Sequence, residues 1–223
     1  MSIVAPVHSK PSLWQVTLGA EGIAAAQFAR YGFDVSVQSG PYKPRYDLVV
    51  AKAGHLLKVS VMGSEDGIWA LTQSYLKRAV DLSRNKADCH GAIDQWLDHN
   101  GSLTVCCLVQ FQGVPMNELP RMYLATPQEV ARELRETVDR LGSSWLYEEY
   151  AWTSGGEKSS AIERLPSAWR FSHERLQEML ALQGAGMHLK PQPVKIESSA
   201  LTWPGSGILP LDGHAALAAG VAS

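Results

Sequence analysis

The chain has 223 residues, a length that suits one substantial domain with extensions. Hydrophobic residues make up 45% and charged residues 19% of it, as in ordinary globular proteins, so a core can form without disulfide bonds. The formal net charge of -2 argues against a protein that coats nucleic acid through overall positive charge.

Hydrophobic periodicity and turn residues predict the elements in chain order. The expected elements are a helix over 13–31, strands over 33–38, 46–51 and 56–62, a helix over 87–99, strands over 103–111 and 121–125, a helix over 127–141, a strand over 144–153 and a helix that Ser172 caps and that reaches 182. The segment 63–67 is expected to end the third strand, and 68–82 suits either a short strand or a helix.

Several element ends have local signals. Gly32 stands where a helix-terminating glycine belongs. Thr126 and Glu129, with Pro127 at the first helical position, form a capping-box pattern. In the strand 33–38, alternation places Phe33, Val35 and Val37 on one face.

The almost uniformly apolar run 103–111 predicts a central strand that is covered on both faces. It contains Cys106 and Cys107, which should point to opposite faces, and with Cys89 they are expected to be buried, reduced thiols. No signal peptide is visible at the start, and no apolar run approaches the roughly 18 residues that span a bilayer. We therefore expect a cytoplasmic protein with no membrane partner.

The predicted order is α-β-β-β-α-β, followed by a C-terminal β-α-β-α extension, which indicates an α/β fold. The expected organisation is an N-terminal extension over 1–12, a domain over 13–182 and a disordered tail over 183–223. The tail is assigned because residues 184–223 hold six glycines and four prolines with few periodic apolar positions.

One polar constellation stands out on the expected hairpin. Asp47 begins its first strand, and alternation along the second strand places Lys58, Ser60 and Met62 on one face. The apolar residues between them belong to the core face. We expect the face with Lys58, Ser60 and Met62 to point outward, near Asp47.

A helix with an acidic residue, followed by a hairpin with Asp and a later Glu-X-Lys, is the signature of the PD-(D/E)XK nuclease superfamily. This region of the chain resembles that signature. The segment 18–22 is similar to the Holliday-junction resolvase-like branch of this superfamily. The segments 44–50, 108–111 and 120–127 are similar to its small bacterial endonuclease-like proteins. The resemblance covers roughly residues 13–171. It implies a restriction-endonuclease-like core, with a mixed central sheet flanked by helices, in a bacterial protein with DNA as partner and a homodimeric state.

The resemblance implies that Glu21 and Asp47 bind Mg²⁺ or Mn²⁺, which activates water for phosphodiester hydrolysis. It assigns the second acid to Ser60 and the catalytic lysine, which stabilises the developing anion, to Met62. Serine is a weak metal ligand and methionine is uncharged. The chain therefore departs from the family pattern, with a degenerate catalytic motif.

Three functional hypotheses follow. The first is an impaired nuclease-like protein that acts as a nucleic-acid-binding or accessory module. The second is a metal-dependent DNA endonuclease, a phosphodiesterase whose site has migrated, with Lys58 as the lysine and Glu65 or Asp66 as the second acid. The third is a protein-interaction or dimerisation module without nucleic acid, which the low net charge favours.

Basic residues gather around Asp47 in the sequence. Lys43, Arg45 and Lys52 are the candidate nucleic-acid contacts, because clustered cations on one face follow a phosphate backbone even when the total charge is negative. A solvated surface without a ligand is the alternative interpretation.

Overall fold

The structure, a computed structural model, describes residues 10–39, 44–76, 86–101, 104–153 and 160–186. These residues belong to the compact unit Met1–His188. Lys43 and residues 187–223 of the expected tail lie outside the described residues. Within the described part, no helix is long and apolar enough to cross a membrane.

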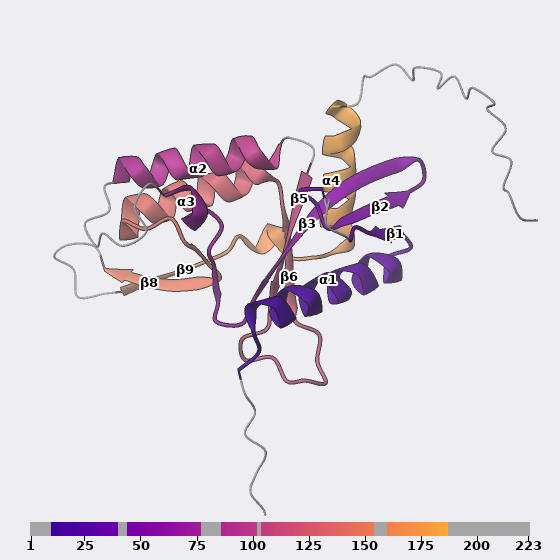
Figure 1. The fold of residues 1–223 in the computed structure, drawn as a ribbon, viewed down its shortest axis with the longest axis horizontal. Coiled ribbons are helices and arrows are strands. Elements are labelled where there is room, and N and C mark those ends of the chain that lie inside the picture. The colour runs from indigo at the N-terminus through magenta and orange to yellow at the C-terminus, as the bar shows by residue number, and fades with distance from the viewer. Residues whose placement is uncertain (1–9, 40–43, 77–85, 102–103, 154–159, 187–223) are drawn as a thin grey trace, which may run out of the picture. The chain divides into compact units, whose positions relative to one another are not determined.

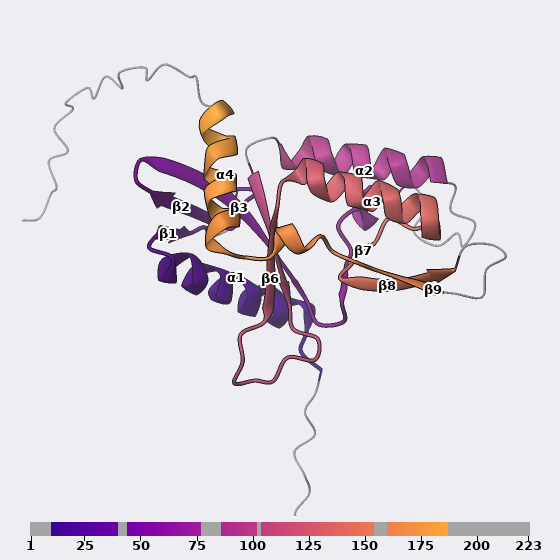
Figure 2. The same ribbon diagram turned by 180° about the vertical axis from the view of Figure 1, so that it is seen from behind.

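The described residues form four α-helices, a main sheet and smaller pairs of strands; Figures 1 and 2 show their arrangement. The helices are α1 (Leu13–Arg30), α2 (Lys86–Asn100), α3 (Pro127–Leu141) and α4 (His173–Gly186), with short 3₁₀ helices η1 (Gln73–Tyr75) and η2 (Ser167–Trp169). The main-sheet strands are β1 (Asp34–Val37), β2 (Leu48–Lys52), β3 (His55–Ser64), β5 (Thr104–Gln110) and β6 (Arg121–Ala125). The small sheets pair β4 (Ile68–Trp69) with β7 (Leu146–Tyr147), and β8 (Glu149–Thr153) with β9 (Ser160–Arg164).

The main sheet has the strand order β1-β2-β3-β5-β6. All neighbours are antiparallel except β3 and β5, which are parallel and are connected through α2. The β2–β3 connection is a two-residue turn in which Ala53 and Gly54 both have positive φ, as a tight hairpin with the right-handed strand twist requires. The expected α-β-β-β-α-β order and the mixed α/β fold are confirmed.

Alternate residues of β5 belong to two hydrophobic cores, one on each face of the sheet. Val105, Cys107 and Val109 belong to the first core, which contains residues of α1 and α4. Cys106 and Leu108 belong to the second core, which contains residues of α2 and α3. Helices α2 and α3 lie side by side over this second face (Figures 1 and 2). The prediction of a central strand covered on both faces is therefore confirmed.

All three cysteines are buried and form no disulfide, as expected. Burial, with a smaller contribution from Glu129, raises the pKa of the Cys106 thiol to about 12. Burial, Cys106 and Asp47 also raise the pKa of Cys107. Since the thiolate is the reactive form of cysteine, Cys106 and Cys107 are structural core residues.

Helix α1 approaches the sheet most closely at Gly63 of β3. A Cβ atom at Gly63 would lie 2.9 Å from the carbonyl oxygen of Val16 and 3.0 Å from the Cβ of Ala20. Ala20 is fully buried at this crossing. The absence of a side chain at Gly63 thus sets the distance between α1 and the sheet.

Three sequence expectations need correction. Strand β3 runs two residues past the expected end at Met62 and ends at Ser64, within the segment 63–67, because its parallel partner β5 extends the ladder. The expected strand 144–153 is two strands, β7 and β8, which pair in different sheets, and β9 was not anticipated. Helix α4 reaches Gly186, beyond the expected end at 182. At the edge of the sheet, Val37 is 54% exposed, whereas Phe33, which alternation places on the same face, is buried.

Helix α4 is held to the rest of the fold by Arg175, whose side chain is 3% exposed. Its guanidinium donates to Glu129 Oε2 (2.6 Å), to the carbonyl oxygen of Leu124 (3.0 Å) and to Glu178 (2.6 Å). Glu129 also closes the predicted capping box by accepting from the Thr126 N–H at 2.7 Å. Burial raises the pKa of Glu129, but the hydrogen bonds from Arg175 and Thr126 lower it more, and its pKa lies below the ordinary value.

We predict that Gly63→Ala destabilises the fold by about 1–3 kcal/mol, because the methyl group overlaps α1. Gly22→Ala is the control in α1 itself. A Cβ there meets nothing within 4 Å, so this change should stabilise the helix by up to about 1 kcal/mol. Urea denaturation of both variants checks the pair, and equal effects would contradict the close approach of α1.

We predict that Glu129→Gln flattens the acid dependence of stability. Because folding lowers the pKa of Glu129 from 4.5, its contribution is complete above that value and is lost as the pH falls through the lower folded pKa. Urea denaturation at pH 7 and at steps from about pH 5 to 3 should show a smaller loss in the variant than in the wild type. Glu178→Gln, at the more exposed partner of Arg175, is the control and should retain the wild-type slope.

Candidate functional site

Asp47 directly precedes β2 and is bonded to β3 through its backbone and its side chain. Its N–H donates to the Val59 carbonyl oxygen (2.8 Å), and its Oδ2 accepts the N–H of Val61 (2.5 Å). The pairing of β2 with β3 ends at Leu48 and Val59, so Asp47 lies just outside it and is bonded to the residues on either side of Ser60. The carboxylate of Asp47 therefore has a structural role as the acceptor for a backbone N–H in the sheet.

Lys58, Ser60 and Met62 share one face of β3, as alternation predicts. The expectation that this face points outward is wrong at Met62, which packs against the second core. The Met62 carbonyl oxygen also accepts the indole N–H of Trp69 at 3.0 Å. At the other end of the row, the ammonium of Lys58 lies 5.3 Å from the ring centre of Tyr46.

Glu21 lies on α1 and is partly buried, one residue after the point where that helix meets the sheet. Over the described ranges, no group of three or more His, Cys, Asp or Glu side chains is arranged to hold a metal ion. Mg²⁺ is also bound by one or two carboxylates with waters, so the assignment of Mg²⁺ or Mn²⁺ to Glu21 and Asp47 stays a prediction.

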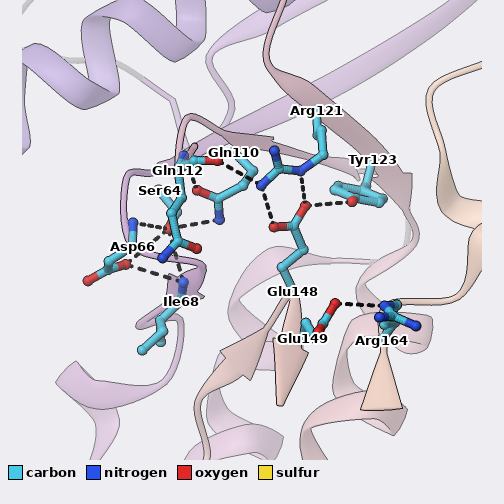
Figure 3. A network of polar contacts seen from close by, with 10 residues as sticks. All are labelled: Ser64, Asp66, Ile68, Gln110, Gln112, Arg121, Tyr123, Glu148, Glu149 and Arg164. Carbon is cyan, nitrogen blue, oxygen red and sulfur yellow. Dashed lines mark hydrogen bonds and ion pairs between the residues drawn. The ribbon is translucent and has the colours of Figure 1, made fainter. Parts of the chain in front are cut away.

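The two acids considered as replacements for the missing carboxylate have other partners. Glu65 forms an ion pair with Lys10 (2.9 Å). Asp66 Oδ1 accepts from the Ser64 hydroxyl (3.1 Å) and from the Ile68 N–H (3.2 Å), which holds the turn after β3 (Figure 3). Both acids therefore hold the β3–β4 connection.

The described cations predicted to contact nucleic acid are bonded to helix ends. Arg45 donates to the carbonyl oxygen of His99 in the last turn of α2 (2.9 Å). Lys52 donates to the carbonyl oxygen of Tyr31, the C-cap of α1 (2.5 Å). Helix C-termini carry partial negative charge and unpaired carbonyl groups, so cations there stabilise the helix.

The sequence reasoning missed a row of polar groups on the same face of the sheet, beyond Met62. Gln110 is fully buried, and its amide donates to the Ser64 hydroxyl (3.3 Å) and accepts the Gln112 N–H (2.8 Å). Figure 3 shows this group beside Arg121. A glutamine at the end of an otherwise apolar central strand was the available signal.

Arg121, Tyr123 and Glu148 form the most completely bonded part of this row (Figure 3). Arg121 contacts both carboxylate oxygens of Glu148, at 2.6 and 2.7 Å, and the Tyr123 hydroxyl donates to Glu148 at 2.6 Å. Burial raises the pKa of Glu148, but these hydrogen bonds lower it more, and the net pKa lies below the ordinary value. Burial and the bond to Glu148 raise the pKa of Tyr123 to about 12.

Comparisons with known proteins give limited information. No protein-family model matches the chain, and no curated protein is significantly similar to it. A solved structure described as a bacterial homing endonuclease, I-Ssp6803I, is 17% identical, with 79% of this chain and 98% of that chain covered and a TM-score of 0.43. At this level of similarity, no activity is transferred to this chain.

We predict that Asp47→Ala destabilises the fold by about 1–3 kcal/mol, because it leaves the N–H of Val61 without its acceptor inside the sheet. Asp47→Asn retains an oxygen at this place and should cost clearly less. Thermal or urea denaturation of the two variants checks this. Equal stability of Asp47→Ala and wild type would contradict the structural role of the carboxylate.

Proposed function

We propose that this protein is a PD-(D/E)XK nuclease-like protein with an impaired catalytic centre that acts as a nucleic-acid-binding or accessory module. The most direct support is the pair of hydrogen bonds between Asp47 and β3. They go to Val59 and Val61, the neighbours of Ser60. Ser60 stands where the family pattern has an acid, and Met62, the next residue on its face of the strand, stands where the pattern has a lysine.

The fold supports this comparison of positions. Asp47 stands at the start of β2, Ser60 and Met62 lie within β3, and the two strands form a hairpin that follows α1. This arrangement is compatible with the family pattern and supports the proposal. The proposal therefore depends on which side chains occupy these positions.

The chemistry of these side chains explains the proposed impairment. A serine hydroxyl is a poor ligand for a hard divalent cation, and a thioether cannot neutralise charge on a phosphate oxygen. Removal of one positioned electrostatic group typically costs about 10²–10³ in rate. Two such replacements around one aspartate should reduce phosphodiester hydrolysis further.

The packing at Met62 adds a second reason. Met62 contacts the second core, and its backbone carbonyl is bonded to Trp69. A lysine ammonium at this position would be partly withdrawn from water, which is unfavourable without a charged partner. A methionine at this position supports the core that a lysine would disturb.

We predict that the wild type does not cleave plasmid or branched DNA with Mg²⁺ or Mn²⁺. The double variant Ser60→Glu, Met62→Lys restores an acid and a lysine on the strand to which Asp47 is bonded and should gain metal-dependent cleavage. Adding Asp47→Asn to the double variant should abolish that gain. Asn is preferred to Ala here because it retains an oxygen acceptor for the sheet.

Denaturation curves of all variants control for folding. Wild-type cleavage that Asp47→Asn removes would contradict the proposal and support an active endonuclease with a migrated site. A wild type that neither cleaves nor binds DNA in a salt-dependent manner would support the protein-interaction alternative.

A further inference from the structure

An arginine-rich pocket of about 520 Å³ lies beyond β6, on the side of the polar row opposite Asp66. The residues that line it come from β6, the β7–β9 region and η2: Arg121, Tyr123, Glu148, Glu149, Arg164, Leu165, Pro166, Ser167 and Arg170. Its volume is within the usual range for pockets that bind small molecules or parts of a larger ligand.

The charges in this pocket do not cancel. Arg121 is paired with Glu148, and Arg164 is paired with Glu149 at 2.6 Å. Arg170 has no ion pair within the part of the chain that the structure describes, and its guanidinium lies 5.9 Å from the ring centre of Tyr123. Three arginines and two glutamates leave one uncompensated positive charge.

The uncompensated cation has a well-defined backbone position. Arg170 forms a β-bridge with Tyr123, and its N–H donates to the carbonyl oxygen of Ser167 at 3.1 Å. The bidentate contact of Arg121 with Glu148, whose side chains are 33% and 14% exposed, forms another part of the lining. A cation on a fixed backbone loses less conformational freedom when it binds an anion.

Arg164 is the second cation that can reach a ligand. Its side chain is 65% exposed and that of Glu149 is 50% exposed, so their ion pair lies in solvent. Solvent-exposed ion pairs contribute little to stability, and Arg164 can exchange Glu149 for another anion at low cost. The pair Arg121–Glu148 is buried more deeply and remains in place.

We propose that this pocket binds one phosphodiester of a nucleic-acid strand, with Arg170 and Arg164 as the donors to its oxygens. The proposal rests on the proposed nucleic-acid-binding function and names its phosphate contact. Guanidinium groups match the two exposed oxygens of a phosphate, and a phosphodiester carries the single negative charge that the pocket lacks. A doubly charged phosphomonoester would be opposed by Glu148 and Glu149.

The apolar part of the pocket supports the same ligand class. Pro166 is partly exposed beside the cations, next to the buried Leu165, and offers an apolar contact for the sugar or base next to the phosphate. Arg45 and Lys52, which the sequence suggested for this task, are bonded to helix ends. The pocket is therefore a better place for a phosphate contact than the surface around Asp47.

The test is fluorescence anisotropy with labelled single-stranded and duplex oligonucleotides at several salt concentrations. Arg170→Ala should weaken binding about tenfold and reduce the slope of log K against log salt by about 1. Arg164→Ala should weaken binding less. Arg132→Ala, at an exposed arginine of α3 outside the pocket, removes the same charge and should leave the affinity unchanged.

Glu149→Gln should tighten binding, because it frees Arg164 from its ion pair. A misfolded variant would not show tighter binding. If the wild type binds DNA and none of the pocket variants changes the affinity, the phosphodiester site is overturned while the proposed function stands. If the wild type binds no nucleic acid at any salt concentration, both are overturned. Competition by polyglutamate as strong as that by unlabelled DNA would overturn the phosphodiester assignment in favour of a general anion surface.

Discussion

The parallel pairing of β3 with β5 is the constraint on which the rest of this structure depends. Two adjacent parallel strands cannot be joined by a tight turn, so the chain must cross one face of the sheet, and it does so through α2. The opposite face is covered by α1 and α4. Because both faces of β5 are buried, its sequence is apolar from Val105 to Val109, and Gly63 in β3 admits the backbone of α1.

The same pairing sets the surroundings of the β2–β3 hairpin. The face of β3 that contains Ser60 and Met62 continues into the second core through Met62. Asp47 accepts a backbone N–H of β3, so an acid is useful there even without catalysis. Arg45 and Lys52 are bonded to helix C-termini, and their positions near Asp47 in sequence follow from the packing of those helices.

The polar side chains on this face gather where β5 ends and β6 begins. Gln110 has a bonded partner although it is fully buried, and Arg121 and Tyr123 share the carboxylate of Glu148. Buried polar groups in such networks stabilise only when their partners are present, which gives this part of the sheet a defined geometry. The arginine pocket is built on that geometry, with Arg170 held beside Tyr123.

The sequence by itself determined the elements whose signals are local. The box of Thr126 and Glu129 predicted α3, Gly32 marked the end of α1, and the apolar run of β5 predicted a strand buried on both faces. It also placed Asp47 and the Lys58–Met62 row on one hairpin, because alternation is a property of the strand alone. Only the tertiary structure decided where β3 ends, that 144–153 divides between two sheets, which cations bind helix ends and how Arg164 and Arg170 meet in one pocket. Each of these depends on a partner far away in the chain, and local periodicity contains no information about such partners.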